Sequence, residues 1–411
     1  MSGSGKCQKV VATIAVALSG SLALLAASAA PKASGAARAP AGDAFYVPPE
    51  PLVEAKPGTI IRSTPIAAPA GARAWKILYH SRAVNGRDIA VSGVVVAPSA
   101  TPKPRGGRVV VTWAHGTAGL ADVCAPSKQP DIASGASGAG IGFPRGLIPM
   151  LQTFLDAGYV VAATDYEGLG TPGLHPYLVG ESEGRGVLDA ARAARSLKAA
   201  AAGSRALVFG LSQGGHAALF AGELAASYAP ELHVLGVGAV APPAGAEQSL
   251  PFLGTVSAFN GFVVTIIEAF HAAYPQLDPA AFLTPDALAK ASVVEQKCDV
   301  TETFSGSTDL ALAQNPLDIP AMATILHANS AGNRPAGAPL LVVQGTADQL
   351  VPQLFTDALV AKACAAGDTV DYRLYAGATH GDPELNAAAN DISAWFTDRV
   401  SGKPATSTCS P

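Results

Sequence analysis

The chain has 411 residues, of which 49% are hydrophobic and 14% are charged. This length allows one large domain with an insertion, or two domains, around a sizeable apolar core. The formal net charge is −4 and no stretch is rich in lysine and arginine, so we do not expect nucleic acid as a partner.

The first 29 residues have the pattern of an export signal. Two lysines precede an apolar stretch over residues 10–27, and Ala27-Ser28-Ala29 is a small-residue cleavage site. The stretch approaches the length of a membrane anchor, which is the alternative interpretation. Its serine and glycine residues and its alanine-rich end favour a cleaved signal. We therefore expect a secreted protein, extracellular or in the cell envelope, with a flexible lead over residues 30–45.

Strand and helix patterns alternate along most of the remaining chain. The predicted strands, which are short and apolar, cover residues 74–80, 88–96, 108–113, 159–164, 206–209, 232–240, 339–343 and 369–375. The helices predicted between them cover residues 146–157, 184–201, 352–365 and 386–400. Such alternation is typical of an α/β fold with a mostly parallel central sheet and helices on both faces.

The alternation is interrupted over residues 242–336, where no clear buried strand appears. Helices are predicted there over residues 259–273, 285–298 and 319–329. We interpret residues 242–336 as an inserted helical cap, which divides the core into residues 46–241 and 337–411. An insertion at the carboxyl ends of strands lies above the edge where open α/β sheets bind ligands.

Gly210-Leu211-Ser212-Gln213-Gly214 is a G-x-S-x-G motif. A predicted strand ends just before it and a predicted helix begins just after it. A serine on so sharp a turn is the nucleophile elbow of the α/β-hydrolase fold. The bare motif also occurs by chance, so the flanking strand and helix are what make it informative. The helix N-terminus would direct free N–H groups at developing negative charge.

A nucleophilic serine needs a base, and the base needs an orienting acid. In this fold the chain order is serine, acid, histidine. Asp348 follows the predicted strand 339–343, and His380 lies in the loop before the last predicted helix. Asp348 could otherwise cap the helix that follows it. Asp371 and Asp391 are weaker candidates, because they fall inside a predicted strand and a predicted helix.

The oxyanion that forms on attack needs two preorganised donors. We expect one to be the backbone N–H of Gln213, which follows the nucleophile. The other should come from Gly116 or Thr117, in the loop after the predicted strand 108–113, although a plain tight turn is the alternative for this loop. His175 is also in a loop and is a candidate for lining the site.

The predicted helix that begins near residue 259 is apolar around most of its circumference, and Glu268 is the only charge in residues 259–270. One face can pack inside the cap, and this is the simpler interpretation of the whole helix. The remaining apolar surface would need cover, since large exposed patches are rare. We therefore expect Phe262 and Ile266 to line a channel for an acyl chain over Ser212.

Four cysteines follow the signal segment: Cys124, Cys298, Cys364 and Cys409. An even number in an oxidising compartment indicates two disulfides, for which three pairings are possible. A metal site is not expected, because no two of these cysteines are close in sequence.

Several segments together resemble the secretory lipases, the lipase-A-like branch of the α/β-hydrolases, over about residues 46–409. They are His115-Gly116-Thr117, Cys124-Ala125-Pro126-Ser127, Asp165-Tyr166-Glu167-Gly168, Gly180-Glu181-Ser182-Glu183-Gly184, Gly210-Leu211-Ser212-Gln213-Gly214-Gly215 and Ser227-Tyr228-Ala229-Pro230-Glu231-Leu232. The resemblance implies a Ser-Asp-His triad at Ser212, Asp348 and His380, and a helical cap at the insertion. It also implies disulfides between Cys124 and Cys298 and between Cys364 and Cys409. The His-Gly-Thr loop departs from well-studied members, which carry an acidic residue there, so the second oxyanion donor stays open.

The sequence therefore predicts a secreted serine hydrolase that cleaves lipid esters, as a triacylglycerol lipase or carboxylesterase, through an acyl-enzyme on Ser212. A short-chain esterase or polyester hydrolase is the nearest alternative. A non-catalytic binding protein of the same fold is the alternative from another class. No metal or cofactor is implied. The expected partner is a lipid or other small ester, met at a lipid–water interface, with no nucleic acid and no obligate protein partner.

Overall fold

The computed structural model of the chain describes Met1 and residues 42–99, 104–133, 148–304, 307–380 and 388–409. The expected export signal and residues 30–41 of the expected lead lie outside these residues. The expected flexible lead ends too late, because Gly42–Phe45 forms a 3₁₀ helix and the side chain of Phe45 is buried. The core and the cap pack into one unit, Ala39–Pro411.

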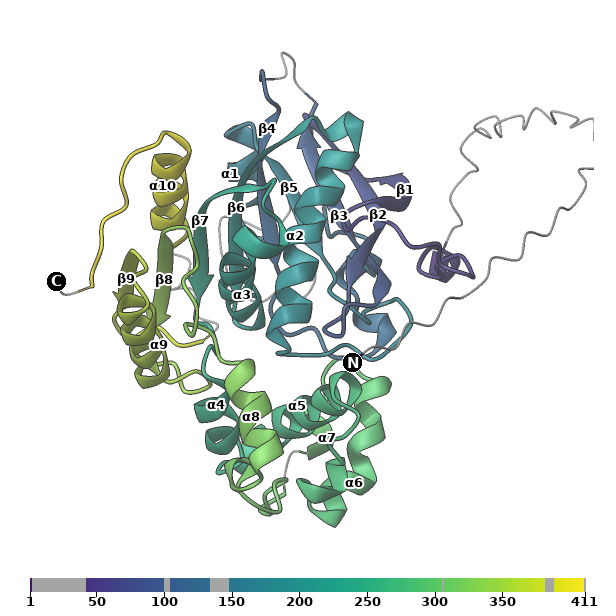
Figure 1. Ribbon diagram of the computed structural model, residues 1–411, viewed down its shortest axis with the longest axis vertical. Coiled ribbons are helices and arrows are strands. Elements are labelled where there is room, and N and C mark those ends of the chain that lie inside the picture. Colours follow the sequence, from purple (N-terminus) through teal and green to yellow (C-terminus); the bar gives the residue numbers. More distant parts are fainter. Residues whose placement is uncertain (2–41, 100–103, 134–147, 305–306, 381–387, 410–411) are drawn as a thin grey trace, which may run out of the picture. The chain divides into compact units, whose positions relative to one another are not determined.

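The described strands form one nine-stranded sheet in the order β1-β2-β3-β5-β4-β6-β7-β8-β9 (Figure 1). They are β1 (Ile60–Ile66), β2 (Ala72–Arg82), β3 (Asp88–Pro98), β4 (Arg108–Ala114), β5 (Val160–Thr164), β6 (Ala202–Leu211), β7 (His233–Val240), β8 (Leu340–Gly345) and β9 (Val370–Tyr375). The pairs from β1 to β5 are antiparallel, and the pairs from β5 to β9 are parallel. The predicted α/β class with a mostly parallel sheet is confirmed. Strand β1 was not predicted, because it contains Pro65 and has no apolar run; it lies at the sheet edge, where proline is tolerated.

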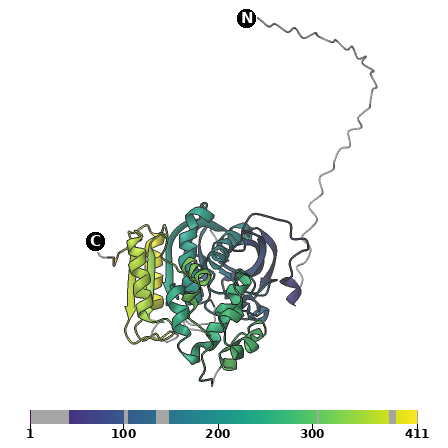
Figure 2. The ribbon, with the colours of Figure 1, turned by 60° about the horizontal axis from the view of Figure 1, so that its bottom comes forward.

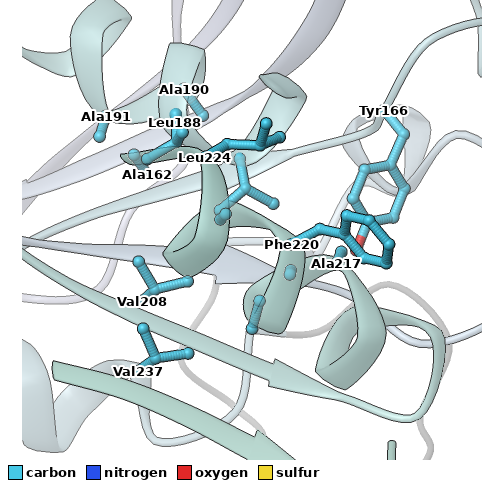
Figure 3. Close-up of a cluster of buried hydrophobic side chains, with 14 of the residues drawn as sticks. Ala162, Tyr166, Leu188, Ala190, Ala191, Val208, Ala217, Phe220, Leu224 and Val237 are labelled. Carbon is cyan, nitrogen blue, oxygen red and sulfur yellow. The ribbon is translucent and has the colours of Figure 1, made fainter. Parts of the chain in front are cut away.

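Five helices of the described core cover the two faces of the sheet. They are α1 (Leu151–Asp156), α2 (Gly180–Ser196), α3 (Gln213–Tyr228), α9 (Gln353–Ala365) and α10 (Ala388–Val400). Apolar side chains of α2, α3 and α9 join the sheet in one buried cluster, and those of α1 and α10 join it in another. Figure 3 shows part of the first cluster, where Val208 and Val237 of the sheet lie near Leu224 and Phe220 of α3. The predicted covering of both faces is therefore confirmed.

The described elements between β7 and β8 are helical, and Figure 2 shows these green helices in front of the sheet. They include α4 (Ala246–Leu253), α5 (Asn260–Ala273), α6 (Pro285–Lys290), α7 (Thr301–Phe304) and α8 (Pro320–Ala328). Their apolar side chains form most of a third buried cluster, which also takes in Leu120 and Tyr177–Val179 from loops of the core. The helix predicted over residues 285–298 is shorter than expected, because α6 passes into the 3₁₀ segment Ala291–Glu295. Helices α4 and α7 were not predicted.

None of the described helices combines the length and the hydropathy of a membrane span. Helix α4 and Ser257–Ala273 reach both only when they are taken together, and the two are bent by 115° relative to each other.

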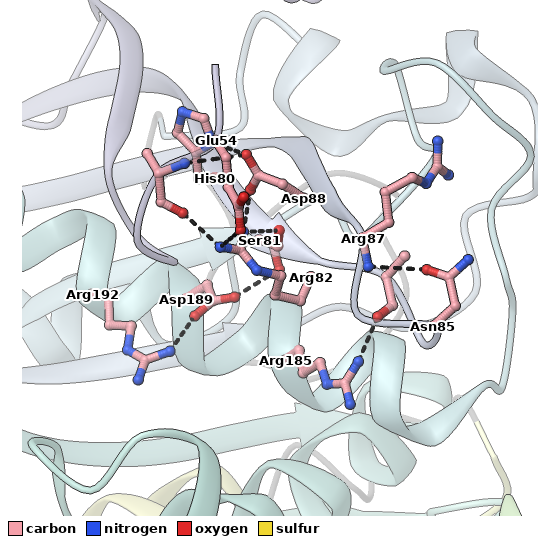
Figure 4. Close-up of polar contacts among 12 residues, drawn as sticks. Glu54, His80, Ser81, Arg82, Asn85, Arg87, Asp88, Arg185, Asp189 and Arg192 are labelled. Atoms are coloured by element: carbon pink, nitrogen blue, oxygen red, sulfur yellow. Dashed lines mark hydrogen bonds and ion pairs between the residues drawn. The ribbon is translucent and has the colours of Figure 1, made fainter. Parts of the chain in front are cut away.

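Polar contacts fasten the β2–β3 hairpin to α2 (Figure 4). The hydroxyl of Ser81 donates to Asp189 on α2 over 2.7 Å, and the guanidinium of Arg192 pairs with the same carboxylate over 2.8 Å. Arg185 donates to the backbone carbonyl of Ala83 in the hairpin turn. Because Asp189 is completely buried, desolvation raises its pKa to about 6 against the hydrogen bonds that it accepts. These contacts fix the position of α2, and the first turn of α2 lies at the candidate site.

Two disulfides connect distant parts of the described chain. Cys124, in the loop after β4, is bonded to Cys298 in the cap, 174 residues further on. Cys364 on α9 is bonded to Cys409 near the C-terminus, 45 residues further on. The pairing is the one that the family resemblance implies, so one bridge joins the cap to the core and the other joins the tail to the core.

Candidate active site

Ser212 stands on a tight turn between β6 and α3. Its φ of 57° is unusual for a residue other than glycine, and its backbone N–H is held by the carbonyl of Val240 over 2.8 Å. The glycines on either side are required by close packing. A Cβ on Gly210 would lie 1.9 Å from the carbonyl oxygen of Gly214, and one on Gly214 would lie 1.9 Å from that of Ala114. The turn therefore depends on both glycines of the motif.

Three of the predicted residues meet at the carboxyl ends of the strands. The hydroxyl of Ser212 lies 2.9 Å from Nε2 of His380, and Nδ1 of His380 lies 2.7 Å from Oδ2 of Asp348. The other carboxylate oxygen, Oδ1, accepts the backbone N–H groups of Leu350 and Val351 over 3.0 and 2.9 Å. Asp348 thus holds the loop before α9 as well as the ring of His380, but it does not cap α9, whose N-cap is Pro352 without a side-chain hydrogen bond.

Gln344 supports this carboxylate and was not anticipated from the sequence. Its side chain is fully buried at the end of β8, and its amide nitrogen lies 3.2 Å from Oδ2 of Asp348. The amide oxygen accepts the hydroxyl of Thr356 on α9 over 2.7 Å. An amide at the end of a buried strand gives no signal in the sequence that would separate it from an ordinary core position.

The candidate oxyanion donors lie beside Ser212. Gln213 is the first residue of α3, where backbone N–H groups have no partner within the helix. Thr117 lines the same cavity as Ser212, whereas Gly116 is not part of its wall. The hydroxyl of Thr117 is hydrogen-bonded to that of Tyr177 over 2.8 Å. Thr117 is therefore the better placed of the two candidates from this loop.

A cavity of about 250 Å³ opens at Ser212 between the core and the cap. Its wall is mostly apolar and includes Leu120, Phe262, Val294, Val300 and Leu350. The expectation for Phe262 fits this wall, but Ile266 does not line it. The face of α5 toward the cavity carries Gly261, Phe262 and Thr265, and Ile266 is rotated about 90° from the centre of that face, into the cap core.

His175 also differs from its expected position. Its ring is fully buried, and it is not part of the cavity wall. Nδ1 donates to the carbonyl of Glu167 over 2.9 Å, and Nε2 faces the side-chain amide of Gln213 over 2.7 Å. Burial lowers the pKa of His175 to about 4. The expectation that His175 lines the substrate site is therefore wrong. His175 contacts the side chain of Gln213 instead.

Buried ionisable side chains lie next to the elbow. Glu183 on α2 is fully buried; its Oε1 accepts the amide of Gln213 over 2.8 Å, and its Oε2 faces Nδ1 of His216 over the same distance. Nε2 of His216 faces the backbone carbonyl of Asn329, at the end of α8, over 2.9 Å. A network of polar side chains therefore runs from the elbow to the cap. The sequence marked Gln213 and the Gly180-Glu181-Ser182-Glu183-Gly184 segment, but not His216 or Asn329.

Asp165 forms a second buried polar group at the end of β5. It accepts a hydrogen bond from Ser92 over 2.6 Å and two from the backbone and side chain of Ser127. Burial raises the pKa of Asp165, and burial lowers the pKa of the neighbouring His115. Both shifts favour neutral groups in this region. Among the described residues, no three His, Cys, Asp or Glu side chains are arranged to hold a metal ion.

A serine at an elbow, with a histidine and an aspartate after later strands of the same sheet, is the arrangement of the α/β-hydrolases. The chain belongs to the secretory lipase family, whose model matches residues 147–408. The family predicted from the sequence is thereby confirmed.

Individual relatives are distant. Lipase A of Arthroderma benhamiae is 26% identical over 405 residues, which cover 90% of this chain and 82% of that protein. A Mycobacterium tuberculosis protein named probable inactive lipase MT1628 is 25% identical over 386 residues, which cover 89% and 84%. The crystal structure of Candida antarctica lipase A matches with a TM-score of 0.73 at 21% identity, covering 89% of this chain and 87% of that chain. This last likeness shows a shared fold.

Proposed function

We propose that this protein hydrolyses carboxylic esters of lipids through an acyl-enzyme on Ser212. The observation that carries the proposal is the hydrogen-bonded series from Ser212 through His380 to Asp348, at the wall of a mostly apolar cavity. One relative is named as inactive, so family membership alone does not establish catalysis. The close contacts among all three groups support a catalytic protein over a binding protein of the same fold.

The reaction would proceed in two halves. Nε2 of His380 takes the proton of Ser212 as Oγ bonds to the ester carbonyl carbon, and the charged ring is held by Asp348. The carbonyl oxygen becomes an oxyanion beside the N–H of Gln213 and the Thr117 loop. When the tetrahedral centre collapses, the alcohol leaves with the proton from His380. Water then attacks the acyl group, gives its proton to His380 and releases the acid and the free serine.

The cavity wall supports an acyl chain as the bound group. Its apolar residues come from the core loops after β4 and β8 and from the cap, and they share one cavity with Ser212. Each methylene removed from water there would contribute up to about 0.8 kcal/mol of binding free energy. A protein with such a wall would meet its substrates at a lipid–water interface. A short-chain esterase remains the nearest alternative, and chain-length preference separates the two.

The proposal is tested by replacing the nucleophile. Ser212→Ala should lower hydrolysis of p-nitrophenyl esters by at least about 10⁴-fold and abolish labelling by a fluorophosphonate probe, because the activated nucleophile is gone. Ser227→Ala is the matched control, since Ser227 lies on the same helix and bonds only a backbone carbonyl in the structure, Leu224. Unchanged turnover in Ser212→Ala would reject the proposal.

We also propose that the protein is exported and that its signal is removed after residue 29. The support is the Ala27-Ser28-Ala29 pattern and membership of a secretory family. Sequencing the N-terminus of protein recovered from the culture medium should begin at Ala30. A mature protein that retains residues 10–27 would instead indicate a membrane anchor.

A further inference from the structure

The side chain of Gln213 is unusually constrained for a residue next to a nucleophile. It is fully buried, and its amide nitrogen donates to Nε2 of His175 and to Oε1 of Glu183. The opposite amide orientation would place its oxygen against the Glu183 carboxylate, so the nitrogen must face these two acceptors. Two hydrogen bonds therefore fix the side chain of the same residue whose backbone N–H is the first candidate oxyanion donor.

His175 can accept this hydrogen bond because of its own partner. Nδ1 donates to the carbonyl of Glu167 over 2.9 Å, which leaves the lone pair of Nε2 for Gln213. The ring also stacks on Tyr166, with ring centroids 5.5 Å apart and planes inclined by 8°. The lowered pKa of His175 keeps the ring neutral at neutral pH, so Nε2 remains an acceptor under ordinary assay conditions.

The next residues reach the other side of the oxyanion hole. Tyr177 is buried, and its hydroxyl lies 2.8 Å from Oγ1 of Thr117. The backbone N–H of Leu178 donates to Oε1 of Glu183 over 2.8 Å, on the same oxygen that accepts Gln213. Leu178 has a φ of +58°, an unfavourable conformation for this residue that surrounding contacts must maintain.

We propose that residues 175–178 form a brace that sets the distance between the two sides of the oxyanion hole. Thr117 follows β4 and Gln213 begins α3, and the brace contacts Thr117 through Tyr177 and Gln213 through His175. The donors must lie within hydrogen-bond distance of the same developing oxygen, so a small change in their spacing weakens both interactions. This inference rests on the proposed ester hydrolysis, and it makes His175 and Tyr177 positioning residues.

Gln213 satisfies the buried polar groups around it only in part. Its amide oxygen is buried and has no hydrogen-bond partner among the described residues. An apolar side chain of similar size would remove this unsatisfied carbonyl, but it would also remove the donor to Nε2 of His175 and to Oε1 of Glu183. The two hydrogen bonds of the amide nitrogen are what distinguish glutamine from such a side chain, and both lead to the brace or to Glu183.

The first test removes one hydroxyl. Tyr177→Phe should lower kcat roughly 5- to 50-fold, with KM changed less than about 2-fold. This loss of kcat is smaller than the roughly 10²- to 10³-fold loss expected when an oxyanion donor is deleted. The affinity of a boronic acid that forms a tetrahedral adduct with Ser212 should fall in parallel. Tyr372→Phe is the matched control, because Tyr372 on β9 loses a hydroxyl that contacts Asp357 on α9 instead. Its kcat should stay within about 2-fold of wild type.

The second test uses rescue at His175. His175→Gln places an amide oxygen near the position of Nε2 and should retain most of kcat, whereas His175→Leu should lose it as Tyr177→Phe does. Unchanged kcat in both Tyr177→Phe and His175→Leu, with Ser212 still labelled by fluorophosphonate, would overturn the brace and leave the proposed function intact. Equal losses in His175→Gln and His175→Leu would also overturn it, as a general packing role. A wild-type protein without labelling or hydrolysis would instead overturn the proposed function.

Discussion

The core and the cap contribute different parts of the candidate site. Ser212 follows β6 and Asp348 follows β8, on turns held by backbone hydrogen bonds to Val240 and to Asp348 itself, and His380 comes five residues after the end of β9 at Tyr375. The cap supplies cavity wall, through Phe262, Val294 and neighbouring residues, and none of these three groups. The reacting groups thus depend on the most regular part of the molecule, and much of the shape around the substrate depends on short helices that pack in a different buried cluster.

The two regions are nevertheless tied together close to the elbow. The side-chain oxygen of Asn329, at the end of α8, accepts the N–H of Gly180, the first residue of α2, over 2.9 Å. Its side-chain nitrogen lies 3.1 Å from the hydroxyl of Tyr274, at the end of α5. The Cys124–Cys298 bond adds a covalent tie at the cavity wall. The core and the cap are therefore firmly attached to each other and differ in role: the core carries the reacting groups and the cap carries cavity wall. Substitutions can separate these two roles.

The largest effect should come from the core acid. Asp348→Asn should lower kcat by about 10⁴-fold on esters of every chain length, because the amide no longer orients and stabilises the charged ring of His380. Steady-state kinetics measure this effect. Asp371→Asn is the control, since Asp371 lies on β9 and pairs with Arg373. A large loss of kcat in the control and a small one in Asp348→Asn would mean that the orienting acid is misassigned.

Removing the two disulfides one at a time should distinguish the effect of attaching the cap from the effect of attaching the tail. The chain-entropy model gives about 5 kcal/mol for the 174-residue separation and about 4 kcal/mol for the 45-residue one, and measured losses are often smaller. Urea denaturation of the two double serine variants measures these losses. Only Cys124→Ser/Cys298→Ser should also change the ratio of long-ester to acetate-ester hydrolysis, because Cys298 lines the cavity. A changed ratio in Cys364→Ser/Cys409→Ser would contradict this division.

Acid should destabilise the core through His175. Burial lowers the folded-state pKa of His175 to about 4, against roughly 6.5 in an unfolded chain. Between these values the unfolded state binds more protons, so the free energy of unfolding rises with pH and is lost as pH falls from about 6.5 to about 4. The loss is up to about 3 kcal/mol. Denaturation of wild type and His175→Gln at pH 7 and pH 4 should show the smaller acid loss in the variant; equal losses would refute the assignment.

The smallest effect should be a change of selectivity in the cap. Phe262→Ser should lower kcat/KM for a decanoate ester about 10- to 100-fold, and for an acetate ester less than about 3-fold, because only the longer acyl chain reaches this part of the wall. Ile266→Ala is the control, since Ile266 is buried in the cap core. It should reduce stability and leave the decanoate-to-acetate ratio near wild type. Equal losses on both esters in Phe262→Ser would place the acyl chain elsewhere.

Local patterns explain why part of this site could be predicted. The elbow is a strand, a turn and a helix in continuous sequence, and Asp348 and His380 each follow a predicted strand in the order that the fold requires. Tyr177, Glu183 and Gln344 could not be assigned a role in this way. Tertiary packing brings their partners together, so the local sequence does not indicate the contact. Gln213 and His175, which are 38 residues apart, are another such pair.

The same limit applies to the cap. The apolar sequence of α5 predicted a helix correctly, but a helix that is apolar on nearly every side does not reveal which side meets a cavity. Phe262 and Ile266 were therefore indistinguishable until the rotation of the helix was known. The edge strand β1 was missed for the opposite reason, because it is only partly buried and has no apolar run to mark it.

The positions of the two disulfides also determine where the backbone can be cut without separating the molecule into two fragments. A single proteolytic nick between residues 124 and 298 leaves its two fragments joined through Cys124–Cys298, and a nick between residues 364 and 409 leaves them joined through Cys364–Cys409. In both cases Ser212 and His380 stay on one covalent molecule. Between these two loops lies the stretch from 298 to 364, where one nick would let the fragment carrying the serine separate from the fragment carrying the histidine.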